Sequence, residues 1–145
     1  MAAVVASPKA ASAAPPEPVD DRFVAEGYCD FPVRVKATGK QIFRELPGGD
    51  FFLQGSQGTA TYTNLDDPEN RLVFRGGGAG RITPLENGDV LVVARGHNTL
   101  FDPGEGIFLT VGKVRFTVAS GPGVGGDITI LESRGRLIDL CARLS

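Results

Sequence analysis

Residues 31–38 read FPVRVKAT, and apolar side chains alternate with polar ones along this stretch. Val33 and Val35 stand at odd-numbered positions, and Arg34 and Lys36 stand at the even-numbered positions beside them. Successive side chains of a β-strand point to opposite faces, so a period of two predicts a strand with one buried face. The stretch therefore predicts a sheet that covers a core on one side and meets solvent on the other.

The segments that follow are short apolar runs separated by turn residues. Gly39-Lys40 predicts a two-residue turn before a second strand at residues 41–46. Asn87-Gly88 is the strongest short hairpin signal in the chain. The glycine cluster at residues 76–80 fits a sharp bend within one long strand. Further strands are predicted at residues 51–53, 59–65, 71–75, 81–85, 90–100, 107–118 and 127–134.

The strand predicted at residues 107–118 has apolar side chains on both faces at its start. Either other elements cover both faces there, or a bulge at Gly112 reverses the phase. Residues 136–144 space leucines three and four apart, which permits a short helix or turn, with an extra strand as the alternative. We expect this C-terminal segment, tethered by Cys141, to cover the start of that strand.

About eight strands in meander order, with no helices between them, predict an all-β antiparallel fold. A closed barrel is the expected architecture because closure removes the exposed edges of the sheet. A two-sheet sandwich is the alternative. In either case a short C-terminal helix or turn completes the domain.

The first 28 residues carry almost no bulky apolar side chains, so the folded domain is expected at residues 29–145. Ala11-Ser12-Ala13 fits the small-x-small pattern of a signal-peptidase site, which predicts a signal-peptide remnant upstream. A disordered Ala/Pro tail is the alternative. Residues 15–26 are interpreted as a disordered linker outside the core.

Two cysteines, Cys29 and Cys141, lie at the two margins of this domain. Their spacing is far too wide for a C-x-x-C redox or zinc motif. We predict a disulfide that staples the ends together, which in the chain-entropy view is worth roughly 4–5 kcal/mol for a loop of about 100 residues. This pairing predicts a secreted, extracellular protein; two separate buried thiols in a reducing compartment are the alternative.

Composition argues against several classes of function. The net charge is −2 with both signs interspersed, which gives no electrostatic footprint for nucleic acid. No stretch approaches the ~18–20 consecutive apolar residues of an integral membrane segment. Residues 121–126 match G-x-G-x-x-G, but a strand is predicted after them instead of a helix, so no dinucleotide cofactor is expected. With one histidine and paired cysteines, no metal site is expected either.

The single histidine, His97, shares its strand phase with Arg95. If that phase points into a barrel, the two side chains form a polar spot with Asp102 or Glu105 at its rim. Such a spot can bind an anionic ligand or move a proton, so Arg95 and His97 are the candidate catalytic residues. A hydrogen-bonded or solvent-facing histidine near a strand end is the plainer interpretation.

Four stretches resemble small secreted actinobacterial proteins of unknown function: residues 28–35 (YCDFPVRV), 64–66 (NLD), 95–100 (RGHNTL) and 135–142 (GRLIDLCA). Members typically begin the mature domain with C-x-F-P-V and end it with D-x-C-A-x-L. This chain keeps both cysteine-bearing ends. The resemblance implies secretion and the disulfide, and it assigns no catalytic residue.

The first hypothesis for function is a secreted, non-enzymatic binding module for a small apolar ligand, a cell-surface component or another protein. Its basis is a stapled β scaffold without a recognisable catalytic set; no G-x-S-x-G elbow is present, for example. The alternative is a cofactor-free cyclase or isomerase that acts inside a β-barrel. That alternative depends on the polar spot around Arg95 and His97.

Overall fold

The computed structural model describes residues 16–120 and 126–145. Within them eight antiparallel strands form one sheet, and a short helix ends the chain, which confirms the predicted all-β antiparallel class. The predicted signal-peptide remnant and most of the 121–126 glycine motif lie outside these residues. The elements are β1 (Glu17–Ala25), β2 (Val33–Glu45), β3 (Phe51–Asn64), β4 (Arg71–Arg75), β5 (Gly78–Pro84), β6 (Val90–Asp102), β7 (Gly106–Val118), β8 (Ile128–Asp139) and α2 (Leu140–Leu144).

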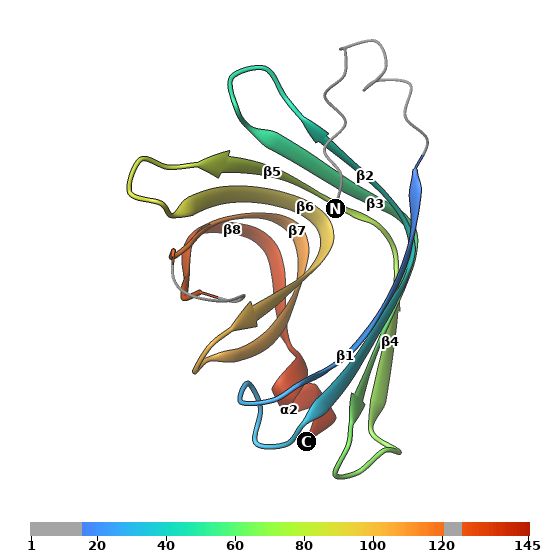
Figure 1. The fold of residues 1–145 in the computed structure, drawn as a ribbon. Coiled ribbons are helices and arrows are strands. Elements are labelled where there is room, and N and C mark those ends of the chain that lie inside the picture. Colours follow the sequence, from blue (N-terminus) through green and yellow to red (C-terminus); the bar gives the residue numbers. More distant parts are fainter. Residues whose placement is uncertain (1–15, 121–125) are drawn as a thin grey trace.

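The sheet is not closed by hydrogen bonds, so the predicted closed barrel is not supported. The strand order is β1-β2-β3-β5-β6-β7-β8, with β4 paired to β3, and no ladder joins β1 to β8 in the described part of the chain. Figure 1 shows β1 to β4 as one wall and β6, β7 and β8 curling beside it; we call these two parts the wall and the scroll. All eight strands belong to the single sheet, which also differs from two separate sheets of a sandwich.

The sheet divides at a crossing of glycines. Strand β3 pairs with β4 along Thr59–Thr63 and with β5 along Phe51–Gln54, whereas β6 pairs with β5 and not with β4. At the crossing, a Cβ on Gly77 would lie 2.4 Å from the carbonyl oxygen of Gly55. A Cβ on Gly96 would lie 2.5 Å from the carbonyl oxygen of Gly77. Only residues without side chains allow these backbones to meet, so the bend predicted at residues 76–80 is also the point where β6 leaves the wall.

Two sequence predictions in the first half of the chain are wrong. Gly39-Lys40 is not a hairpin turn, because β2 runs unbroken and only its register with β3 shifts between Thr38 and Lys40. The runs at residues 51–53 and 59–65 are likewise parts of one strand, β3. In both places a β-bulge interrupts the alternation, and the sequence pattern cannot distinguish this from a turn.

The stretch predicted as a linker, residues 15–26, forms β1 over most of its length. β1 pairs with β2 from Glu17↔Gln41 to Ala25↔Val33, and Ala25 is a buried member of the core. Its short, polar-rich sequence suits an edge strand, which needs few apolar side chains on its solvent face. The folded unit therefore begins before Cys29.

The main core lies between the wall and the scroll. Its buried side chains are Ala25, Val33, Val35, Tyr62, Ile107, Leu109, Leu140 and Leu144. A second cluster lies inside the curl of the scroll, around Ala94, Leu100, Val114 and Phe116. The first half of β7 therefore has packed neighbours on both faces, and Gly112 causes no shift in its register with β6. Leu140 and Leu144 supply the cover expected from the C-terminal segment.

The C-terminus is fastened to the wall by covalent and hydrogen bonds. Cys29 and Cys141 form a disulfide, the pairing that the sequence predicts. The amides of Asn64 and Asn70 both donate to the backbone carbonyl oxygen of Leu144, at 3.0 and 3.2 Å. The Asp139 carboxylate accepts from the Ala142 backbone N–H at 3.1 Å and caps the helix. These contacts hold α2 over the core.

We expect the double substitution Cys29→Ala and Cys141→Ala to lower the free energy of unfolding by about 4 kcal/mol, because the bond closes a loop with a sequence separation of 112 residues. Urea denaturation of the oxidised protein and the variant measures the difference. Oxidised protein treated with a reductant should match the variant. Equal unfolding free energies with and without the bond would contradict the proposed role of the disulfide.

Candidate functional site

Three adjoining cavities share lining residues on β6, and we call them together the groove. Their volumes are about 330, 680 and 410 Å³. Thr99, Leu100 and Phe116 border the first two, and Leu100 and Ile128 border the last two. The groove therefore follows β6, which lines each cavity, and we call its parts the glycine-floored cavity, the seam cavity and the scroll cavity.

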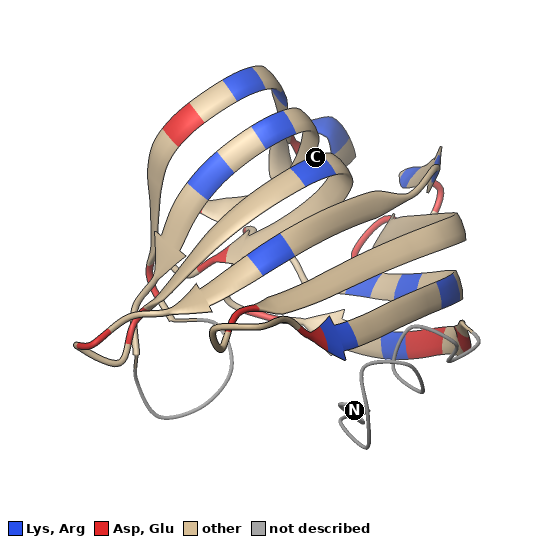
Figure 2. Ribbon diagram, turned by 90° about the horizontal axis from the view of Figure 1, so that it is seen from above, with Lys and Arg blue, Asp and Glu red and all other residues tan. Residues whose placement is uncertain are grey.

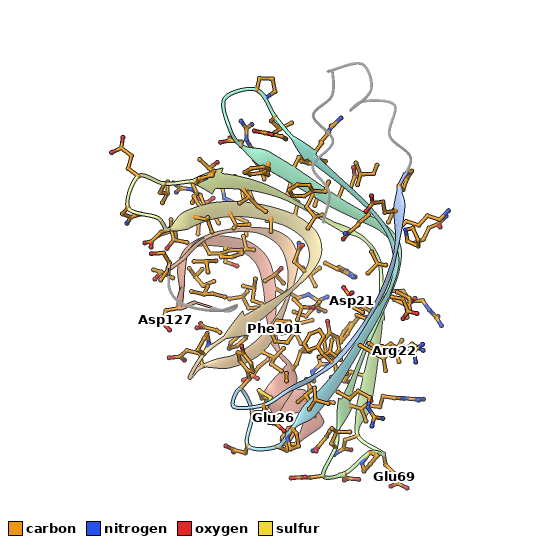
Figure 3. The ribbon with its side chains drawn as sticks, in the orientation of Figure 1. Asp21, Arg22, Glu26, Glu69, Phe101 and Asp127 are labelled. Carbon is orange, nitrogen blue, oxygen red and sulfur yellow. A yellow bond between two sulfur atoms is a disulfide. The ribbon has the colours of Figure 1, made fainter. Side chains whose placement is uncertain are left out.

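The seam cavity exists because the sheet is open. It lies between the edge strand β1 and the strands of the scroll, and its volume is about 680 Å³. Phe23, Tyr28 and Phe101 supply aromatic walls, with the Phe101 ring centroid 5.6 Å from each of the other two. Phe23 is 45% exposed, so the aromatic side of the cavity is open to solvent. Figure 3 shows Phe101 between the wall and the scroll, with Glu26 near the start of the loop that follows β1.

A hydrogen bond beside the seam cavity joins the two parts of the molecule. The hydroxyl of Tyr62 on β3 bonds the hydroxyl of Thr99 on β6. Burial raises the pKa of Tyr62, and the hydrogen bond to Thr99 only partly opposes this shift. The phenol therefore stays neutral at ordinary pH.

The glycine-floored cavity holds His97. The backbone N–H of His97 donates to the carbonyl oxygen of Gly77 at 3.1 Å. Its ring packs against Gly76, where an added Cβ would lie 2.6 Å from Nδ1. Within the described residues Nδ1 is buried and has no hydrogen-bond partner. Most other lining residues of this cavity are glycine or aliphatic, and the polar ones besides His97 are Thr38, Lys40, Gln41, Ser56, Asn98 and Thr99.

The structure does not bring the predicted polar residues together. His97 lines the glycine-floored cavity, but Arg95 is exposed and borders none of the three cavities. Asp102 and Glu105 border the scroll cavity at the other end of the groove. No carboxylate lines the glycine-floored cavity among the residues that the structure describes. The arrangement thus offers an apolar groove with separated polar groups.

The aromatic residues of the seam were missed in the sequence. Phe23 lies in the stretch interpreted as linker, and Phe101 lies just beyond the strand predicted at residues 90–100. The sequence does place Phe23 and Ala25 two residues apart, so that in a strand their side chains would point to the same face. Only the pairing of β1 with β2 decides that this face points toward the core.

Asp102 carries a perturbed carboxyl group at the scroll end of the groove. Burial raises its pKa, a hydrogen bond from the Ile128 backbone opposes the shift, and repulsion from Glu105 and Asp127 adds to it. The carboxyl therefore binds a proton more readily than an ordinary aspartic acid. Across residues 16–120 and 126–145, no group of three or more His, Cys, Asp or Glu is placed to hold a metal ion.

Comparison with known proteins adds no assignment. No protein-family model matches the chain, and searches among curated proteins and solved structures find no significant match. In the described part of the chain, no helix combines the length and the apolar character needed to cross a membrane.

Alanine substitutions at two glycines of the glycine-floored cavity should change the free energy of unfolding by different amounts. Gly76→Ala should lower the free energy of unfolding by about 2 kcal/mol, because φ is +146° and the new methyl would strike His97. Gly80→Ala should change it by less than about 1 kcal/mol, because its Cβ would meet nothing closer than 3.8 Å. Chemical denaturation measures both. Equal losses at the two positions would show that the space around them is not as described.

Asp102→Asn should stabilise the protein at neutral pH and have little effect in acid. A carboxyl whose pKa is raised by folding stabilises the fold when protonated, and this stabilisation is lost as pH rises through the folded pKa. Asparagine keeps an acceptor for the Ile128 N–H and removes the charge. Unfolding curves at about pH 7 and pH 3 test this, with Glu69→Gln on the exposed β3–β4 turn as control. A destabilised Asp102→Asn protein at neutral pH would contradict it.

Proposed function

We propose that this chain is a secreted, non-enzymatic module that binds a small apolar ligand in the seam cavity. The observation that carries the proposal is the seam cavity, with a volume of about 680 Å³ and four aromatic rings in its lining. Binding sites for small molecules are concave, mostly apolar and roughly 300–1,000 Å³ in volume, with a few polar groups that orient the ligand. The seam cavity meets each of these criteria.

Export is supported by the disulfide between Cys29 and Cys141, since such bonds persist in oxidising compartments. The proposal also draws on the resemblance of the two cysteine-bearing ends to secreted actinobacterial proteins. A groove that is open along one side suits a carrier or sensor of apolar molecules outside the cell, because the ligand can enter without unfolding the sheet.

The charges around the seam and scroll cavities restrict the chemistry of the ligand; Lys40 borders only the glycine-floored cavity. Glu26 is the one charged residue that lines the seam cavity in the described chain, and Asp102 and Glu105 are those of the scroll cavity. No lysine or arginine lines either cavity among these residues. An anionic headgroup would therefore be repelled, while a neutral or cationic headgroup would be favoured. We propose an apolar ligand with a neutral or cationic polar end.

The alternative of a cyclase or isomerase has no observation in its favour. It requires Arg95, His97 and a carboxylate around one cavity, and these side chains lie apart. Proton transfer needs the donor and acceptor within hydrogen-bond reach of the substrate. His97 alone, with Nδ1 turned toward Gly76, does not supply that arrangement.

Titration with the neutral fluorophore N-phenyl-1-naphthylamine tests the proposal. The oxidised full chain should bind it saturably, and Phe23→Ala should weaken binding about tenfold, because removing one aromatic contact costs about 1.4 kcal/mol. Phe52→Ala is the matched control, since this ring lies on the opposite face of the sheet beside Arg44. Gly80→Val, which projects into the glycine-floored cavity, should leave the probe affinity unchanged.

Displacement then tests the charge preference. Octylamine should displace the fluorophore at a lower concentration than octanoate, because the ionised residues around the cavity are acidic. An equal loss of affinity in Phe52→Ala and Phe23→Ala, or the absence of saturable binding, would contradict the seam as the site. Better displacement by octanoate would contradict the proposed headgroup.

A further inference from the structure

The outer face of the wall carries an ordered array of side chains whose cations line none of the groove cavities. Residues paired across antiparallel strands share a face, so the register of β1, β2, β3 and β4 defines rows of four residues, one from each strand, which we call rungs. Three consecutive rungs lie on the face turned away from the core. They are Asp20–Thr38–Thr59–Arg75, Arg22–Lys36–Thr61–Val73 and Val24–Arg34–Thr63–Arg71.

The composition of these twelve positions is strongly biased. Five are cations, one is an anion, four are threonines and two are valines, and none is aromatic. The local excess of positive charge is therefore four, on a chain whose net charge is −2. Figure 2 shows Lys and Arg positions, in blue, on neighbouring strands of the wall, and Figure 3 shows Arg22 pointing away from the groove.

Most of these cations have no anionic partner within the described chain. Arg22 contacts Asp20 at 3.3 Å, and both side chains are mostly exposed. Arg34, Lys36, Arg71 and Arg75 make no salt bridge to any described residue. Surface ion pairs of the Arg22 type contribute little and exchange readily with external anions. The array is thus available to a ligand.

The arrangement has the geometry of a linear track. Threonines of β3 form the central column, with the cations of β2 on one side and those of β4 on the other. Adjacent strands lie about 4.8 Å apart, so the two cationic columns are separated by about 10 Å at the backbone. Along one strand, side chains of the same face recur about every 6.7 Å. A single extended chain with regularly repeated anions fits between the columns.

We propose that this face binds a linear glycopolymer of the cell surface whose sugar or polyol units are joined by phosphodiesters. Four of the five cations are arginines, and the planar guanidinium matches phosphate oxygens in a bidentate manner. The half-buried Thr59 and Thr61 of the threonine column offer hydroxyls to the hydroxyl groups of the polymer, whereas Thr63 is buried. The inference is independent of the apolar ligand, because the five cations of the array line none of the three groove cavities.

The composition of the face favours this occupant over other polyanions. Proteins that bind single-stranded nucleic acid on a sheet stack the bases on aromatic side chains, and none of the twelve array positions is aromatic. Proteins that lie in a membrane interface insert Trp, Phe or Leu side chains, whereas Val24 and Val73 are the apolar groups here.

Binding of poly(glycerol phosphate) by the oxidised full chain tests the proposal. At about 50 mM NaCl we expect measurable affinity that falls steeply by about 200 mM NaCl, because counterions are released. The pairs Arg34→Gln with Lys36→Gln, and Arg71→Gln with Arg75→Gln, should each weaken binding about tenfold. The matched control, Arg115→Gln with Arg143→Gln, removes the same charge from exposed positions on β7 and α2 and should change affinity less than about twofold.

Binding of N-phenyl-1-naphthylamine by the same three variants shows that the fold is intact, and it separates this proposal from the apolar-ligand function. Several outcomes would overturn the glycopolymer site: no binding at low salt, an equal loss in the control variant, or equal affinity for polygalacturonate. Tighter binding of oligo-dT would indicate nucleic acid instead. Tighter binding of phosphatidylglycerol vesicles would indicate a membrane surface.

Discussion

Gly77 passes so close to the backbones of Gly55 and Gly96 that no side chain fits between them, and the rest of the structure depends on this contact. On one side of it β4 continues along β3, and on the other β6 departs with β7 and β8. The departure opens the space that the main core fills and leaves the seam between β1 and the scroll. The groove is thus a consequence of how tightly these backbones pack.

The divided sheet needs a separate device to keep its two parts together. The disulfide, the Asn64 and Asn70 bonds to the Leu144 carbonyl, and the Tyr62–Thr99 hydrogen bond all join the wall to elements of the scroll side. They lie on the β4 side of the glycine crossing, where no backbone ladder connects β4 with β6. Covalent and polar links therefore hold together two parts of the sheet that no ladder joins at this place.

The sequence predicts those features of the fold that depend on neighbouring residues or on the number of cysteines. The alternation at residues 31–38, the Asn87-Gly88 hairpin and the paired cysteines at the margins all follow from neighbouring residues or from the cysteine count. The opening of the sheet and the groove were not predictable, because they depend on contacts between Gly55, Gly77 and Gly96, which are far apart in sequence. The seam aromatics were missed for the same reason, since the parity of β1 has meaning only once β2 is beside it.

A one-residue bulge in β3 decides which side chains reach the groove. Thr38 pairs with Thr59 and Lys40 with Ser56, so β3 holds one more residue than β2 between these pairs, at Gln57 with φ of 53°. Because strand faces alternate, the extra residue reverses the phase of β3. The threonines of the second half face outward into the cationic array, while Leu53 of the first half faces the glycine-floored cavity. Without that residue, Leu53 would lie on the solvent side, and the two faces of the wall would lose their separate chemistry.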